Sequence, residues 1–216
     1  MEINAIFASI LLFPLTFFNF DSSLENPSSK TPILLIHGYL SYASTWYYLH
    51  RYLHQKEIGP IYTINLPSLE SIETSAIRIH EKAQEIFAQT SHPNLILIGH
   101  SRGGLAASLY ASQSKNAVSH VITIASPLKG TSWAYASTGK DVIEMQPDSS
   151  FLQKLQTQVA KTNTSFLHIA SYNDWITSPE SSSFEGNSPI LINHLGHLGL
   201  IFSSNVAETI HDWLKT

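Results

Sequence analysis

Short apolar runs alternate with amphipathic stretches along most of the chain after Pro32. The runs contain few polar positions, which is typical of strands in a parallel sheet buried on both faces. We expect strands at Ile33–Ile36, Ile61–Asn65, Leu95–Ile98, His120–Ile124, Phe166–Ile169 and Ile190–Ile192. Apolar spacing of helical period predicts helices over Thr45–Gln55, Ser71–Ala88, Gly104–Ser114, Ser150–Ala160 and Asn205–Leu214.

This alternation predicts a compact α/β fold, with about six mostly parallel strands and helices on both faces. The chain has 216 residues, a length that fits one domain of ordinary size, and we expect residues 31–216 to form it. The sequence shows no internal repeat and no low-complexity tract.

Residues 1–30 differ from the rest. Residues 3–20 are almost wholly apolar, and the polar stretch that follows is typical of a linker. Such a length is borderline for crossing a bilayer. We interpret the segment as an export signal or membrane anchor, which predicts an exported or membrane-associated protein and membrane contact through residues 1–20. The alternative is a segment that packs on its own domain in a cytoplasmic protein.

Composition excludes several kinds of chemistry. The net charge is −4 and no basic run occurs, so no nucleic-acid partner is expected. The chain has no Cys, which excludes disulfides, thiolate metal sites and a Cys nucleophile. Neither a metal nor an organic cofactor is expected.

The candidate nucleophile is Ser101. It lies in Gly99-His100-Ser101-Arg102-Gly103, a Gly-x-Ser-x-Gly motif between an apolar strand and a helix rich in small residues. That context is typical of a strained strand–turn–helix elbow that exposes a serine oxygen. The alternative is an ordinary serine in a strand–helix turn.

A second motif offers donors for an oxyanion. The first strand ends in His37-Gly38-Tyr39, so the chain can turn beside the serine. We expect the backbone N–H groups of Tyr39 and Arg102 to form an oxyanion hole. The alternative is a turn that only ends the strand.

A serine nucleophile needs a base oriented by an acid. Asp174 follows the fifth strand by a few residues, and Glu180 competes with it for the acid. For the base, His197 lies between glycines in a loop before the last helix, and His194 is its competitor. We favour Asp174 and His197.

Together these motifs resemble those of the α/β-hydrolase superfamily, and more narrowly its lipase-like branch. That branch includes bacterial triacylglycerol lipases and GPI inositol-deacylase-like esterases. Residues 125–131 and 196–200 add to the resemblance, which covers about residues 31–215. It implies a Ser-Asp-His triad and no cofactor. Two departures are the absence of the superfamily's first two strands and a short insertion where a lid would lie.

The resemblance implies a serine hydrolase that cleaves carboxylic esters, of lipid or acyl type, through an acyl-enzyme. An acyltransferase or thioesterase would use the same triad, and a catalytically silent binding module is the non-enzyme alternative. Apolar residues of the insertion, from Trp133 to Leu152, could contact an acyl chain or simply cover the sheet. The Arg102 side chain could meet an anionic head group or a neighbouring carboxylate.

Overall fold

The computed structural model describes residues 2, 21–22, 30–114, 116–136 and 138–216. Its centre is a six-stranded sheet in the order β2-β1-β3-β4-β5-β6, and every neighbouring pair is parallel. This confirms the α/β fold and the six strands predicted from the sequence. The strands are β1 (Ile33–Ile36), β2 (Ile61–Ile64), β3 (Leu95–His100), β4 (Val118–Ile124), β5 (Ser165–Ala170) and β6 (Ile190–Leu191).

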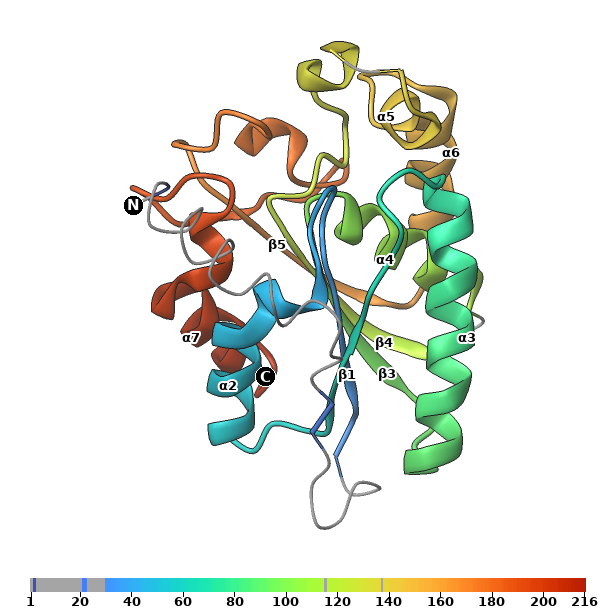
Figure 1. Cartoon of the computed structure of the whole chain (residues 1–216), viewed down its shortest axis with the longest axis vertical. Helices are drawn as coiled ribbons and strands as arrows, with labels where there is room; N and C mark the ends of the chain where they lie inside the picture. The colour runs from blue at the N-terminus through green and yellow to red at the C-terminus, as the bar shows by residue number, and fades with distance from the viewer. Residues whose placement is uncertain (1, 3–20, 23–29, 115, 137) are drawn as a thin grey trace.

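Helices cover both faces of the sheet (Figure 1). Helices α3 (Ile72–Thr90), α4 (Arg102–Gln113) and α6 (Ser150–Val159) bury their apolar sides against one face. Helices α2 (Tyr47–Gln55) and α7 (Ser204–Trp213) pack on the other. Residues of β1 alternate between the two cores, because successive side chains of a strand point to opposite faces.

Serine side chains fix where three of the helices begin. The hydroxyl oxygens of Ser71, Ser149 and Ser203 accept hydrogen bonds from amides in the first turns of α3, α6 and α7. Two predicted boundaries, the end of β3 and the start of α4, differ from those in the structure. Strand β3 continues to His100 and α4 begins at Arg102, so Ser101 alone joins them.

The insertion after β4 lies beyond the carboxyl ends of the strands (Figure 1). It contains η4 (Ser132–Ala136) and α5 (Lys140–Glu144), neither of which the sequence pattern predicts, followed by α6. Elsewhere in the described residues, the 3-10 segments are η3 (Ala43–Trp46), η5 (Pro179–Ser181) and η6 (Gly199–Phe202).

Asp21 and Ser22, near the N-terminus, contact the edge strand β2. Ser22 forms an isolated antiparallel bridge with Ile61, and Asp21 Oδ1 accepts a hydrogen bond from the Thr63 amide at 3.0 Å. Residues 3–20, predicted to be an export signal or anchor, lie outside the described residues, so that interpretation stays a prediction. No helix within the described ranges has the length and apolar character needed to span a bilayer.

Candidate active site

Ser101 occupies a strained backbone turn. Its φ is 54° and its ψ is −126°, a conformation that non-glycine residues rarely adopt. The Ser101 amide donates a hydrogen bond to the Ile124 carbonyl at 2.9 Å, which anchors the turn to β4. Strain of this kind persists only where the surroundings enforce it, and it occurs preferentially at functional sites.

Two glycines permit this sharp reversal. A Cβ on Gly99 would lie 2.5 Å from the Gly104 Cα, and one on Gly103 would lie 2.5 Å from the His37 carbonyl oxygen. Both separations are shorter than real Cβ contacts, so neither position accepts a side chain without movement of the backbone. The motif glycines therefore let α4 pack directly on β3 and β1.

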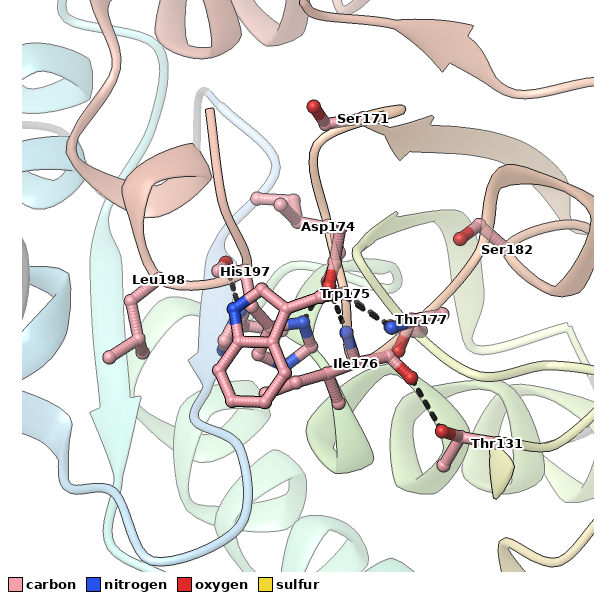
Figure 2. Close-up of polar contacts among 12 residues, drawn as sticks. Thr131, Ser171, Asp174, Trp175, Ile176, Thr177, Ser182, His197 and Leu198 are labelled. Carbon is pink, nitrogen blue, oxygen red and sulfur yellow. Dashed lines mark hydrogen bonds and ion pairs between the residues drawn. The ribbon is translucent and has the colours of Figure 1, made fainter. Parts of the chain in front are cut away.

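Asp174 and His197 form a buried hydrogen-bonded pair. Oδ2 of Asp174 lies 2.8 Å from Nδ1 of His197. The other carboxylate oxygen, Oδ1, accepts hydrogen bonds from the amides of Ile176 at 2.9 Å and Thr177 at 3.0 Å. Figure 2 shows the carboxylate between the histidine ring and these two amides. The loop after β5 thus holds Asp174 rigidly against the histidine loop.

The competing acid and base lie elsewhere. Glu180 is exposed in η5, and His194 is exposed in its loop with a φ of 64°. The amide of His194 donates to Asn173 Oδ1 at 2.9 Å, so this residue ties the two loops together through its backbone. Of the four candidates, the structure brings together Asp174 and His197.

Ser101 and His197 line one cavity of about 330 Å³. Its wall is largely apolar and comes from the loops after β1, β4 and β5, the insertion and the histidine loop. The remaining lining residues are Tyr39, Pro127, Thr131, Trp133, Ala134, Val142, Met145, Ile176 and Leu198. This volume is at the lower end of the range for ligand sites, about 300–1,000 Å³.

The turn before Tyr39 is held by a buried histidine. Nε2 of His37 accepts a hydrogen bond from the Leu66 amide at 2.8 Å. Its Nδ1 therefore carries the proton and donates to the Gly38 carbonyl at 2.9 Å. Burial lowers the pKa of His37 to about 4, so the ring is neutral at pH 7. The Tyr39 amide is thereby presented from a fixed turn.

The Arg102 amide is the first N–H of α4, and first-turn amides have no acceptor within their own helix. The Arg102 side chain points away from solvent and is fully buried. Its Nη2 donates to the Glu70 carbonyl at 2.6 Å and to Ser75 Oγ at 2.8 Å. Its Nε lies 3.4 Å from Asp141 Oδ2. The sequence suggested either an anionic head group or a neighbouring carboxylate as the partner of this side chain. The structure shows the carboxylate of Asp141.

The insertion contributes to both the cavity and the core. Trp133, Ala134, Val142 and Met145 line the cavity, whereas Leu152 is buried against the sheet. The rings of Trp133 and Trp175 meet edge to face at 4.8 Å between centroids, and both are about half exposed at 49% and 60%. The insertion thus contributes both to the cavity wall and to the buried core.

One further contact could not be predicted from the sequence. The Glu2 carboxylate accepts hydrogen bonds from the amides of Leu198 at 2.9 Å and Gly199 at 3.0 Å, directly after His197. Nothing in the local pattern could reveal it, because the partners are 196 and 197 positions apart. Among the described residues, no group of three or more metal-ligating side chains gathers.

A doubly wound parallel sheet with a serine elbow and an Asp–His pair at the carboxyl ends of its strands defines the α/β-hydrolase class. The family model described as "Alpha/beta hydrolase family" matches residues 33–198. The chain belongs to this family, as the sequence motifs indicated.

The relatives that this chain matches have low sequence identity to it. Triacylglycerol lipases of Pseudarthrobacter phenanthrenivorans and Burkholderia plantarii are each 22% identical, over 75% of this chain and 55% and 49% of theirs. The chain thus spans about half the length of the curated relatives it matches.

Among solved structures, mature Bacillus licheniformis lipase BlEst2 superposes with a TM-score of 0.76 at 15% identity, covering 91% of this chain and 97% of that one. Paleococcus ferrophilus monoacylglycerol lipase gives a TM-score of 0.70 at 15% identity, with the same coverage of 91% and 97%. At such identity these structures establish the fold alone.

Proposed function

We propose that the protein is a serine hydrolase of carboxylic esters, in which Ser101 is the nucleophile, His197 the base and Asp174 the orienting acid. The observation that carries this proposal is the Asp174–His197 pair beside an apolar cavity that Ser101 also lines. The distant similarity to triacylglycerol lipases favours lipid or acyl esters as substrates.

In the proposed mechanism, His197 Nε2 takes the proton of Ser101 as Oγ bonds to the acyl carbon. The amides of Tyr39 and Arg102 stabilise the resulting oxyanion. The alcohol leaves with the proton from His197, which produces the acyl-enzyme. A water molecule then gives its proton to His197 and attacks the same carbon, which releases the acid and restores Ser101. Asp174 stabilises the imidazolium formed in both steps.

The cavity favours burial of one acyl chain rather than a whole triacylglycerol. Its volume of about 330 Å³ and its apolar lining fit a single chain of modest length. Trp133, which lines the cavity, contacts Trp175, and both rings are about half exposed, so they offer an apolar surface to the part of the substrate that stays outside.

Labelling with a fluorophosphonate probe tests the proposal without knowledge of the substrate. We expect wild-type protein to be labelled and Ser101→Ala to be inert. Turnover of p-nitrophenyl esters should fall at least about 10³-fold in the same variant. Labelling that persists in Ser101→Ala, with circular dichroism showing a folded chain, would contradict the assignment.

A further inference from the structure

His100 is a buried histidine that the proposed mechanism does not use. It ends β3, directly before Ser101, and its side chain is enclosed. Its Nε2 lies 3.0 Å from the backbone carbonyl oxygen of His197. The two imidazole rings are 4.8 Å apart between centroids and tilted by 53°. One side chain thus joins the strand that carries the nucleophile to the loop that carries the base.

The same ring also lies against the turn before Tyr39. A Cβ placed on Gly38 would be 3.1 Å from Nδ1 of His100 and 3.0 Å from the Cβ of Ser101. The His37-Gly38 turn therefore crosses directly over His100 and the serine. His100 contacts both segments that we assign to the oxyanion hole and the base.

The hydrogen bond fixes the protonation of His100. A carbonyl oxygen only accepts, so Nε2 must carry the proton. Burial, together with the nearby charge of His197, lowers the pKa of His100 to about 3. The ring therefore remains a neutral donor when His197 becomes positively charged during the reaction, and it adds no second positive charge beside it.

We propose that His100 is a positioning residue for the base, through its Nε2–H bond to the His197 carbonyl. The inference rests on the proposed function of Ser101 and His197. Asp174 holds the His197 ring only at Nδ1, so it constrains the ring more than the backbone that carries it. The bond from His100 fixes that backbone relative to the serine. Catalysis is sensitive to such placement, since a displacement of about 1 Å can cost on the order of 10²-fold in rate.

Two substitutions separate the hydrogen bond from packing. In His100→Gln, the side-chain amide keeps an N–H donor at a reach similar to that of Nε2. His100→Leu fills comparable space without a donor. The matched control is His168→Leu, because His168 is also a buried strand histidine with one hydrogen-bond partner, Thr123 Oγ1 at 2.8 Å. His168 does not line the cavity around Ser101.

We expect His100→Leu to lower kcat and the rate constant of fluorophosphonate labelling about 10- to 100-fold, with KM changed little. His100→Gln should recover most of both rates, and His168→Leu should keep them even if it is less stable. The downfield NMR signal of the proton between His197 Nδ1 and Asp174 should broaden in His100→Leu and persist in His100→Gln.

Several results would overturn the role of His100. These are wild-type labelling by a folded His100→Leu, an equal loss in His168→Leu, and an equal loss in His100→Gln. If His100→Leu does not fold, His100→Asn replaces it, because its amide is too short to reach the carbonyl. Equal activity of the Asn and Gln variants then contradicts the proposal. Labelling that survives Ser101→Ala would instead contradict the proposed function.

Discussion

Arg102 and Asp141 form an ion pair in which neither side chain is exposed, with 3.4 Å between Nε and Oδ2. The pair joins the residue after Ser101 to α5, which brings Val142 and Met145 to the cavity. Burial raises the pKa of Asp141, and the guanidinium opposes that effect. The insertion is thus held to the body of the domain at the position whose amide we assign to the oxyanion hole.

Removing one partner of this pair should destabilise the protein strongly. Asp141→Asn leaves the buried guanidinium uncompensated, which typically costs about 3–5 kcal/mol. Arg102→Met removes the other partner, and the double variant Arg102→Met/Asp141→Asn should lose less than the sum of the two single losses. Urea unfolding measures all three. The control is Glu73→Gln, which breaks an exposed pair with Lys154 and should cost less than about 1 kcal/mol. Additive losses would mean that the buried charges do not interact.

Single variants can separate the proposed base and acid from their neighbours. We expect His197→Ala to lose activity about as fully as Ser101→Ala, and the double variant to lose little more, because triad members act as a unit. His194→Ala should retain most activity, since this side chain is exposed. The measurement is the turnover of one soluble ester by each variant. An inactive His194→Ala beside an active His197→Ala would assign the base to His194 instead.

For the acid, Asp174→Asn should lose a large factor, though less than His197→Ala, because the carboxylate orients the imidazole without taking its proton. Glu180→Gln is the matched control and should retain activity. Full activity of a folded Asp174→Asn would move the acid to another residue.

Buried neutral histidines should make the fold sensitive to acid. Burial lowers the pKa of His37 and of His168 to about 4 each. Between about pH 6.5 and pH 4 the unfolded chain binds protons that the folded chain does not. Stability is therefore expected to fall with decreasing pH in that window, by up to about 1.4 kcal/mol per pH unit for each histidine. Above pH 6.5 these groups contribute no slope.

Urea unfolding of His168→Gln across this window provides the test. The dependence of unfolding free energy on pH should become shallower by about one proton. An unchanged slope in His168→Gln would show that His168 does not contribute.

The acyl preference should depend on the cavity wall. Ala134 lines the cavity, so Ala134→Phe should fill part of it and lower kcat/KM for long acyl chains at least about 10-fold relative to short ones. Ile143→Phe changes an exposed residue of α5 and should keep the wild-type profile. A series of p-nitrophenyl esters measures both. A uniform loss for all chain lengths in Ala134→Phe would place the acyl group elsewhere.

Much of the fold was predictable because its strands are short, nearly continuous apolar runs. The predicted and observed strands agree to within two residues, and the bounds of β1 are the same. The amphipathic helix expected from Ser71 is α3, which begins at Ile72 because the Ser71 side chain accepts from the Thr74 amide. Local pattern and local capping sufficed in these cases.

The pattern failed where polar residues are buried by distant partners. His100 is polar, so the apolar run predicts a strand that ends at Ile98, but the hydrogen bond from His100 to His197 allows His100 to complete β3. Similarly, Arg102 is charged, yet it begins α4 fully buried. Its Nη2 donates to the Glu70 carbonyl and to Ser75 Oγ, and its guanidinium pairs with the Asp141 carboxylate. These partners are far apart in the sequence and meet only in the folded chain.

The contacts of Asp21 and Ser22 have a consequence for self-association. An unpaired edge strand is a template for another chain, and β2 lies at one edge of the sheet. Ser22 exchanges backbone hydrogen bonds with Ile61 at 2.8 and 3.1 Å, and Asp21 accepts from the Thr63 amide. At the opposite edge, β6 has only two residues. A chain shortened to begin at Lys30 would expose the Ile61 and Thr63 amides along β2, so such a truncation is expected to promote aggregation through that edge.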